Sequence, residues 1–345
     1  MTTTDLTPAE REPVRVGLIG AGRIGTSHAT ILRNRVAGAS LVGVADARPE
    51  SAAALADRLE VRAHASPDSL IADPDVEAVV IAASTPAHAD LVVAAATAGK
   101  GVFCEKPMAL TLADADRAVA AADGAGVPLQ VGFNRRFAAD FAAARAAIDA
   151  GEIGTPQLMR SLTRDPGLAD PAAVPPWTIF LLTLVHDFDA LLWLNPGADA
   201  VEVFVMADAL VAPDYKSAGL LDTAIVTIRF DNGALATAEA NFSAAYGYDV
   251  RAEVFGSRGM VTAGRTETSA LRLHTESGMS GPTLRGDVEM FIDAYTSEFA
   301  EFADAVREKR TPAVTGHDAR RALAIALACI ESAQSGSTAR VDPGA

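Results

Sequence analysis

The chain has 345 residues, of which 50% are hydrophobic and 21% charged, and its 29 basic against 44 acidic side chains give a formal charge of −15 at pH 7. One hydrophobic core rarely serves a chain of this length, so we expect two domains. The negative charge argues against nucleic acid or an anionic membrane as a partner, and no uninterrupted apolar run is long enough to span a membrane.

The N-terminal segment, residues 1–12, is polar, contains Pro8 and lacks the apolar core of a signal peptide. It is therefore expected to be a short disordered lead-in. The two cysteines, Cys104 and Cys329, lie far apart in the sequence within apolar patterns. This placement favours two buried, reduced thiols over a disulfide or a metal pair, and it predicts a cytoplasmic protein.

A strand is predicted over Val14–Ile19, and a glycine-rich loop follows it directly and opens a helical pattern. The first glycine of such a loop permits a tight turn, the second lets a pyrophosphate approach the backbone, and the third allows close packing of helix on strand. The N-terminus of the helix then faces the phosphates. A Rossmann-like domain without a nucleotide is the alternative. The loop residues predicted to bind the cofactor are Gly20, Gly22, Arg23, Ile24 and Gly25.

A second predicted strand, over 41–45, ends at Asp46, which lies 21 residues after Gly25. A carboxylate at this place accepts hydrogen bonds from the adenosine ribose and repels a 2′-phosphate. It therefore favours NAD over NADP as cofactor. Ala47 and Arg48 follow as further cofactor-binding candidates, and Arg48 could still meet a phosphate, so NADP stays open as a secondary cofactor.

Strands and helices continue to alternate up to residue 133, which indicates a doubly wound parallel sheet in a Rossmann domain over 13–135. The strand over 78–83 ends before Ser84, Thr85 and His88, where the nicotinamide half of a dinucleotide is expected. His88 is equally well explained as a locally packed residue at the start of a helix. The remaining elements predicted here are helices over 67–71, 86–98 and 112–125 and strands over 102–104 and 129–133.

The strand over 102–104 stops abruptly at Glu105, Lys106 and Pro107. Proline fixes its own φ and biases the preceding residue towards an extended conformation, so Lys106 is held at the carboxyl end of a strand, where open α/β sheets bind ligands. An ordinary solvated lysine before a turn is the alternative. We take Glu105 and Lys106 as cofactor-binding candidates and Lys106 as a catalytic one.

The pattern changes after residue 135, and we expect an α+β domain over 136–345 with a large, mostly antiparallel open sheet. A strong hairpin signal, Asp-Asn-Gly at 231–233, joins two of its strands. Helices on one face would leave the other face uncovered, which suggests a homo-oligomer, a dimer or tetramer, formed through this sheet. The predicted strands are 157–163, 201–207, 223–230, 234–240, 250–255 and 260–262, and the predicted helices are 138–150, 183–194, 288–309 and 317–334, the last packing back on the core.

These motifs together resemble the glucose-fructose oxidoreductase, inositol dehydrogenase and rhizopine-catabolism (Gfo/Idh/MocA) family. The likeness runs from about residue 14 to 341, and the segments 164–166, 246–251 and 256–259 look most like the inositol dehydrogenase branch. The resemblance rests on the loop Gly20–Gly25, Asp46, Thr85-Pro86, Glu105-Lys106-Pro107, the run from Gly132 to Phe137 and His186-Asp187-Phe188-Asp189.

The resemblance implies that Lys106 and His186 face each other across the nicotinamide. The chemistry agrees, because oxidising a secondary alcohol removes a hydride and a hydroxyl proton, and histidine is a suitable base near neutral pH. An ammonium group beside the oxygen stabilises the developing alkoxide. A core histidine is the alternative for His186. The histidines are too scattered to suggest a metal site.

One position departs from the family pattern. Inositol dehydrogenases usually carry an aspartate four residues before the histidine, and here that position is Leu182, which cannot accept a hydrogen bond. Either Asp165 supplies the contact or the substrate differs. The residues expected to bind the substrate are Asn134, Arg135, Asp165, Trp177 and Tyr248. A buried tryptophan is the commoner outcome for Trp177, and salt bridging is the equal alternative for Asn134 and Arg135.

The sequence therefore predicts an NAD-dependent dehydrogenase that oxidises a cyclic polyol, with myo-inositol oxidised to 2-keto-myo-inositol (scyllo-inosose) as the favoured reaction. An NAD(P)-dependent dehydrogenase of an aldose or anhydrosugar is the alternative within enzymes. A non-catalytic nucleotide-binding regulator is the alternative outside them, because a fold does not fix a function.

Overall fold

The computed structural model describes residues 12–168 and 170–344. Apart from Glu12, the expected disordered lead-in over 1–12 lies outside the described residues. The chain divides into two compact units. Unit 1 holds the residues up to 137 together with 292–320, and unit 2 holds 138–291 together with the residues from 321 onward. The sequence pattern suggested two domains in succession, whereas unit 1 takes in a segment from far along the chain.

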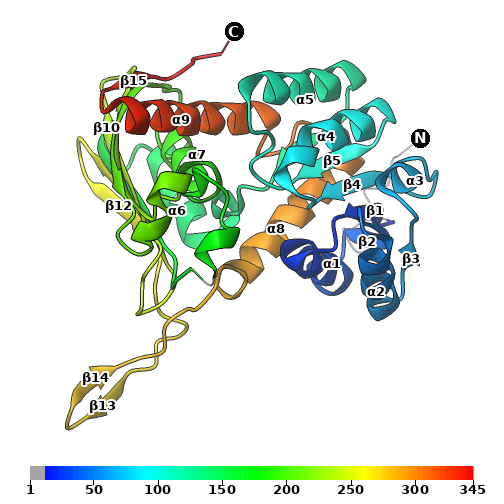
Figure 1. Cartoon of the computed structure of the whole chain (residues 1–345), viewed down its shortest axis with the longest axis horizontal. Coiled ribbons are helices and arrows are strands. Elements are labelled where there is room, and N and C mark those ends of the chain that lie inside the picture. The colour runs from blue at the N-terminus through cyan, green and yellow to red at the C-terminus, as the bar shows by residue number, and fades with distance from the viewer. Residues whose placement is uncertain (1–11, 169, 345) are drawn as a thin grey trace. The chain divides into compact units, whose positions relative to one another are not determined.

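Unit 1 is built on a six-stranded sheet with the strand order β3-β2-β1-β4-β5-β6, in which every neighbouring pair is parallel (Figure 1). All residues of β4 and β5 are buried, as expected where both faces of a parallel sheet are covered. The predicted doubly wound sheet is confirmed. The strands are β1 (Val14–Ile19), β2 (Ala39–Ala45), β3 (Arg62–Ala63), β4 (Ala78–Ile81), β5 (Gly101–Cys104) and β6 (Leu129–Val131).

The helices of unit 1 include one that the pattern analysis missed, α2, although Pro49 at its first position is a common start signal. The core of the unit takes in Phe103 of β5 together with Phe299 and Phe302 of α8, whose ring centroids lie 4.8 and 5.8 Å from that of Phe103. The helices are α1 (Arg23–Arg35), α2 (Pro49–Leu59), α3 (Pro67–Ile71), α4 (His88–Thr97), α5 (Leu112–Ala125) and the later part of α8 (Asp287–Glu308).

Helix α8 was predicted as one continuous amphipathic helix, and it contains one residue with non-helical backbone angles, Phe291, at φ −113° and ψ 17°. The division between unit 2 and unit 1 falls directly after this residue. The pattern of apolar residues continues through the break, so periodicity alone could not reveal it.

Unit 2 is built on a seven-stranded sheet with the order β12-β11-β7-β10-β9-β8-β15. Only the pair β7 and β10 is parallel, so the predicted mostly antiparallel sheet is confirmed. A small hairpin, β13 with β14, projects from this unit (Figure 1) and was not expected. The strands are β7 (Pro156–Arg164), β8 (Ala200–Asp208), β9 (Thr223–Phe230), β10 (Leu235–Asn241), β11 (Asp249–Gly256), β12 (Met260–Ala263), β13 (Leu273–Thr275), β14 (Gly278–Ser280) and β15 (Ala339–Arg340).

One face of this sheet packs against helices, and buried and exposed side chains alternate along β9 and β11. Figure 1 shows α6 (Ala139–Asp149), α7 (Val185–Trp193) and α9 (Gly316–Ser335) along that face. Helix α9 is fixed there by a hydrogen bond from the backbone N–H of Val205 on β8 to Oγ of Ser332, at 3.1 Å.

The other face of the sheet carries exposed large apolar side chains. Leu235, Leu158, Phe255 and Met260 stand directly opposite one another in register across β10, β7, β11 and β12, so they form a continuous row. We call these four residues the open-face row. A second exposed pair, Met206 with Ile225, joins β8 to β9 on the same sheet.

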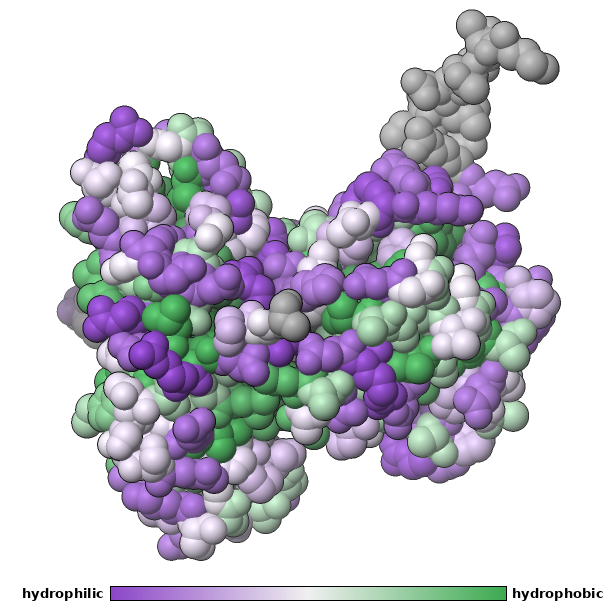
Figure 2. Space-filling view, turned by 90° about the horizontal axis from the view of Figure 1, so that it is seen from above, coloured by the Kyte–Doolittle hydropathy of each residue, from purple (hydrophilic) through white to green (hydrophobic). Residues whose placement is uncertain are grey.

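The surface in Figure 2 shows hydrophilic residues interspersed with smaller groups of hydrophobic ones. Such a mixture is normal for the surface of a folded domain. Among the described residues, no helix combines the length and the apolar character needed to cross a membrane. Cys104 and Cys329 are both buried and form no disulfide.

Candidate active site

The glycine loop between β1 and α1 has the geometry that its sequence predicts. Gly20 has a φ of +108°, and a Cβ there would lie 2.4 Å from the carbonyl oxygen of Ala82. A Cβ on Gly25 would lie 1.9 Å from the carbonyl oxygen of Gly20, so this glycine lets the helix pack closely on the loop. A Cβ on Gly22 would meet nothing within 4 Å, which leaves open space above the backbone at the start of α1. Arg23 and Ile24 form the first turn of that helix.

Asp46 lies at the carboxyl end of β2, beside the glycine loop. Its Oδ2 accepts a hydrogen bond from the backbone N–H of Ala21 at 2.6 Å, and its Oδ1 accepts one from the backbone N–H of Arg48 at 2.8 Å. Nε of Arg48 lies 3.9 Å from Oδ1, and the Arg48 side chain is mostly exposed. The structure therefore brings the carboxylate, Ala47, Arg48 and the glycine loop to one place, as the motif requires.

Ser84 and Thr85 follow β4, and His88 begins α4. The His88 side chain is buried, with Nδ1 2.9 Å from the carbonyl oxygen of Pro107 and Nε2 2.9 Å from that of Ala83. Both ring nitrogens therefore face backbone carbonyls within unit 1, which agrees with the local packing that was the alternative. A direct contact of His88 with the cofactor stays a prediction.

The Glu105-Lys106-Pro107 loop begins where β5 ends, and its lysine–proline peptide bond is cis. Glu105 is buried, and its Oε1 lies 2.5 Å from Nε2 of His28 on α1. Its Oε2 accepts a hydrogen bond from the backbone N–H of Lys106 at 3.1 Å. Burial by itself raises the pKa of the Glu105 carboxyl, but the hydrogen bond and charge of His28 and the charges of Lys106 and His88 hold that pKa below its ordinary value. The Lys106 side chain is partly exposed.

Asn134 and Arg135 follow β6 in a short 3-10 turn and are almost completely buried. None of the described residues donates a hydrogen bond to Oδ1 of Asn134. Arg136 pairs with Asp318 at 3.2 Å; burial raises the pKa of the Asp318 carboxyl, and the charge of Arg136 and bonds from Thr315 lower it below its usual value. Asn134 and Arg135 lie at the same edge of the parallel sheet as the glycine loop and Lys106, because parallel strands end together.

His186 is the second residue of α7 in unit 2 and is partly buried. A π-helical segment, Ile179–Leu184, leads directly into this helix. The predicted helix over 183–194 therefore begins differently from an ordinary α-helix. Leu182, four residues before His186, lies within this π-helical segment, in which residues five apart are paired. The neighbouring position at five residues is Leu181, which is also apolar.

Asp187, next to His186, is fully buried and holds α7 against β7. Its Oδ1 accepts a hydrogen bond from Oγ of Ser161 at 2.5 Å, and its Oδ2 accepts one from Oγ1 of Thr163 at 2.7 Å. A buried carboxylate needs such donors to replace the hydrogen bonds that water would otherwise supply. The helix that carries His186 is therefore anchored to the sheet by the adjacent residue, a role that the first-turn position of Asp187 did not reveal.

Asp165 and Tyr248 lie at one end of the sheet of unit 2. Asp165 follows β7 and Tyr248 precedes β11, and their neighbours Arg164 and Asp249 are paired across the two strands. Trp177 has a φ of +61°, and its ring stacks on that of buried Phe180 at 6.5 Å. The Trp177 side chain itself is only partly buried, and contacts of all three residues with a substrate stay predictions.

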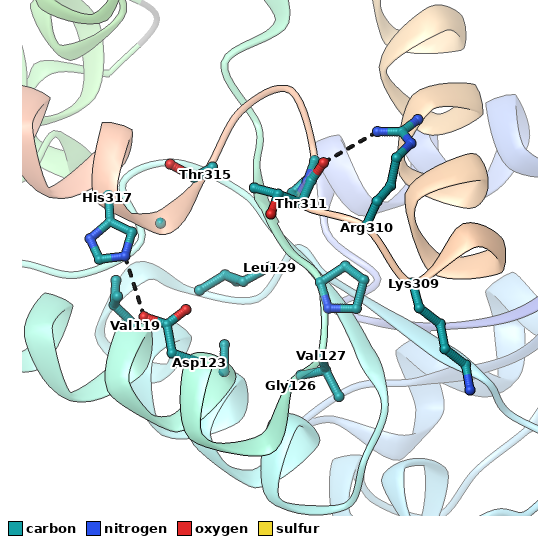
Figure 3. A pocket seen from close by; sticks show the side chains of 14 residues that line it. Val119, Asp123, Gly126, Val127, Leu129, Lys309, Arg310, Thr311, Thr315 and His317 are labelled. Carbon is teal, nitrogen blue, oxygen red and sulfur yellow. Dashed lines mark hydrogen bonds and ion pairs between the residues drawn. The ribbon is translucent and has the colours of Figure 1, made fainter.

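A pocket of about 280 Å³ lies elsewhere in unit 1 (Figure 3), between α5 and residues 309–317. His317 pairs there with Asp123 at 3.3 Å, and the guanidinium of Arg310 is held by Glu301 and Glu308. The pocket is also lined by residues 126–128, which precede β6, so it opens at the amino end of the strand. No predicted site residue lines it, and it is not the nucleotide site.

Comparison with known protein families identifies the family to which the chain belongs. Residues 14–133 match the model of the Gfo/Idh/MocA oxidoreductase family for its NAD-binding Rossmann fold, and residues 145–341 match the model for its C-terminal alpha/beta domain. The chain belongs to this family. The resemblance predicted from the motifs is thereby confirmed, and the protein is an oxidoreductase whose cofactor is NAD.

Individual relatives agree over nearly their whole length. The chain is 39% identical over 328 residues to the myo-inositol 2-dehydrogenase of Thermotoga maritima, covering 92% of this chain and 96% of that protein. It is 35% identical to the scyllo-inositol 2-dehydrogenase (NAD(+)) of Bacillus subtilis, covering 95% and 96%. The structure of scyllo-inositol dehydrogenase from Lactobacillus casei, with bound NAD(H) and scyllo-inositol, matches with a TM-score of 0.91 at 26% identity, covering 96% and 99%.

The residues of unit 1 fit NAD. The open space at Gly22 suits a pyrophosphate, and Asp46 is placed to meet the adenosine ribose while repelling a 2′-phosphate. One important side chain, His28, was missed by the sequence analysis, because its partner Glu105 lies 77 residues away and no local pattern marks the pair.

Replacing Asp46 tests the cofactor preference. We expect Asp46→Ser to weaken NAD binding by about tenfold, roughly the effect of losing one charged hydrogen bond. The variant should also reduce the difference between the affinities for NAD and NADP. Calorimetric titration with each nucleotide measures both effects. Asp57→Ser, which removes an exposed carboxylate of α2, is the matched control. An unchanged ratio of the two affinities would contradict the role given to Asp46.

Proposed function

We propose that this protein is an NAD-dependent dehydrogenase that oxidises one secondary alcohol of a cyclic polyol, myo-inositol to 2-keto-myo-inositol. The observation that carries the proposal is the lysine loop at the carboxyl end of β5, which stands at the same edge of the parallel sheet as the glycine loop and Asp46. The inositol dehydrogenases that match both parts of the chain support the choice of substrate.

Lys106 and His186 carry the proton chemistry in this proposal. NAD, when bound, accepts the hydride that leaves the alcohol carbon. His186 takes the hydroxyl proton as a general base, and the ammonium of Lys106 stabilises the negative charge that develops on the substrate oxygen. Asn134 and Arg135, buried beside β6, and Asp165 and Tyr248, at the end of the second sheet, are the groups proposed to bind the other hydroxyls.

Leu182 favours a second candidate, an NAD(P)-dependent dehydrogenase of an aldose or anhydrosugar. Leu181 and Leu182 both lie in the π-helical segment before His186, and neither side chain has an atom that can accept a hydrogen bond from a hydroxyl group. A substrate with fewer hydroxyl groups on the side that faces these leucines would lose no hydrogen bond to the protein. Lys106 and His186 would then act on a sugar in the same roles.

A substrate panel separates these candidates. We expect NAD reduction, followed by its absorbance, with myo-inositol or another inositol in preference to glucose, xylose or an anhydrosugar. Activity only with sugars would establish the second candidate. Absence of turnover with every substrate, combined with tight NAD binding by calorimetry, would contradict both and point to a nucleotide-binding regulator.

The role of Lys106 is tested by Lys106→Ala. We expect the turnover number to fall by about 100-fold or more, because the variant loses the charge beside the developing alkoxide, while NAD binding stays within a few-fold. His186→Asn should lower turnover by a similar factor through loss of the base. Lys309→Ala, which removes an exposed ammonium after α8, is the control and should remain active. A fully active Lys106→Ala protein would refute the assignment.

We also propose that the protein is a homo-oligomer, a dimer or tetramer, that assembles through the sheet of unit 2. The open-face row and the pair Met206 and Ile225 place large exposed side chains side by side across neighbouring strands. Contiguous apolar surface of this kind is typical of an association site. The buried thiols of Cys104 and Cys329 support a cytoplasmic location.

Charged substitutions on the sheet test this assembly. Phe255→Asp combined with Ile225→Asp should lower the molar mass measured by light scattering to that of a smaller assembly, because carboxylates would have to be buried without partners. Leu273→Asp on the exposed hairpin strand β13 is the control and should leave the mass unchanged. A monomeric unsubstituted protein at micromolar concentration would contradict the proposal.

A further inference from the structure

The Glu105-Lys106-Pro107 loop, which we call the lysine loop, contacts a different buried histidine at each of its two ends. At its first residue, Nε2 of His28 lies 2.5 Å from Oε1 of Glu105, and the two side chains are 0% and 8% exposed. At its last residue, Nδ1 of His88 lies 2.9 Å from the carbonyl oxygen of Pro107. We infer that His28 and His88 are positioning residues that fix where the loop presents the ammonium of Lys106. This inference rests on the proposed function of Lys106.

The Glu105 carboxylate transmits the position of His28 directly to the lysine. One of its oxygens meets the His28 ring, and the other accepts the backbone N–H of Lys106 itself at 3.1 Å. A carboxylate only accepts hydrogen bonds, so Nε2 of His28 must carry a proton, and the bond is charge-assisted. Two hydrogen bonds therefore connect the ring of His28 to the main chain of Lys106.

The ring of His28 is itself held rigidly by three aromatic side chains. It makes edge contacts with Phe103, Tyr295 and Phe299, with centroids 6.2, 5.2 and 4.9 Å away. Among the described residues, no group forms a hydrogen bond with its Nδ1. An apolar side chain would fill this aromatic site without the cost of burying a polar group. The hydrogen bond to Glu105 therefore explains why a histidine ring lies there.

His88 ties the other end of the loop to the neighbouring strand. Its Nε2 lies 2.9 Å from the carbonyl oxygen of Ala83, directly after β4, while its Nδ1 reaches Pro107. Both acceptors are carbonyl oxygens, so a ring nitrogen that carries a proton donates to the carbonyl it faces. The ring thus connects the two stretches that follow β4 and β5, where Ser84, Thr85 and Lys106 lie.

Positioning matters for this lysine because its side chain is long and flexible. A backbone shift of about 1 Å moves the ammonium away from the reacting oxygen, and such misplacement costs on the order of 100-fold in rate. The nucleotide contacts at Gly22 and Asp46 are made by other loops. Loss of either histidine tie should therefore lower turnover more than it weakens NAD binding.

Matched substitutions test each tie. His28→Phe fits the aromatic site without a donor, whereas His28→Gln keeps an N–H donor near the position of Nε2. His88→Asn keeps a donor near the position of Nδ1, towards Pro107, whereas His88→Gln keeps one near Nε2, towards Ala83. We expect His28→Phe and His88→Gln to lower turnover about 10- to 100-fold, with His28→Gln and His88→Asn within about fivefold of the unsubstituted protein. The NAD dissociation constant should stay within about threefold in both His28 variants, and in His88→Gln it should change less than turnover does.

A second measurement reports the environment of the Lys106 ammonium and does not depend on enzyme turnover. Acetylation of each lysine by a water-soluble N-hydroxysuccinimide ester is followed by mass spectrometry, with the exposed Lys216 and Lys309 as internal references. The relative rate at Lys106 should change about threefold or more in His28→Phe and His88→Gln and return in their partner variants. The two ties are independent, so if one variant fails to fold, the other pair decides.

Unchanged turnover and an unchanged acetylation rate at Lys106 in the donor-lacking variants would overturn the inference. It would also be overturned if NAD binding weakened as much as turnover, because that result would show a general loss of the nucleotide fold. If the unsubstituted protein oxidises none of the polyols or sugars, the proposed function fails, and the acetylation rates alone decide whether the histidines position Lys106.

Discussion

A carboxylate taken out of water destabilises a protein unless donors surround it, and Glu105 is surrounded on both oxygens. This requirement constrains much of unit 1. The donor His28 lies on α1, the helix whose first turn follows the glycine loop, so one rigid helix sets both the backbone that meets the cofactor phosphates and the carboxylate behind Lys106. The two loops of the site therefore cannot shift independently.

Unit 2 also contains a buried carboxylate whose two oxygens both accept hydrogen bonds. His186 is followed by Asp187, whose buried carboxylate is satisfied by the hydroxyl groups of Ser161 and Thr163 on β7. In each unit, the residue proposed to react stands next to a buried acid whose hydrogen bonds reach a neighbouring element. The acid gives the adjacent side chain a fixed backbone, and the reacting side chain remains partly exposed.

Local patterns were sufficient for the parallel sheet, because buried strands read as short apolar runs and each loop at the carboxyl edge carries its own motif. Helix α5 was predicted with its observed bounds, Leu112–Ala125. The π-helical segment before His186 could not be foreseen, since an apolar run fits a four- or five-residue pairing equally well. The tie from His28 to Glu105 depends on tertiary contact, and no single-sequence pattern encodes it. The role of Asp187 likewise depends on partners that lie on a distant strand.

The aromatic residues around His28 come from two distant parts of the chain, Phe103 from β5 and Tyr295 and Phe299 from α8. During synthesis, the first 137 residues leave the ribosome long before residues 292–320 that belong to the same compact unit. Until then Phe103 and His28 have only part of their surroundings, and the apolar surface awaiting α8 stays exposed. The nucleotide-binding unit is therefore complete only after α8 has been synthesised, although it begins first, and a chain that terminates early leaves the His28 ring without two of its three aromatic neighbours.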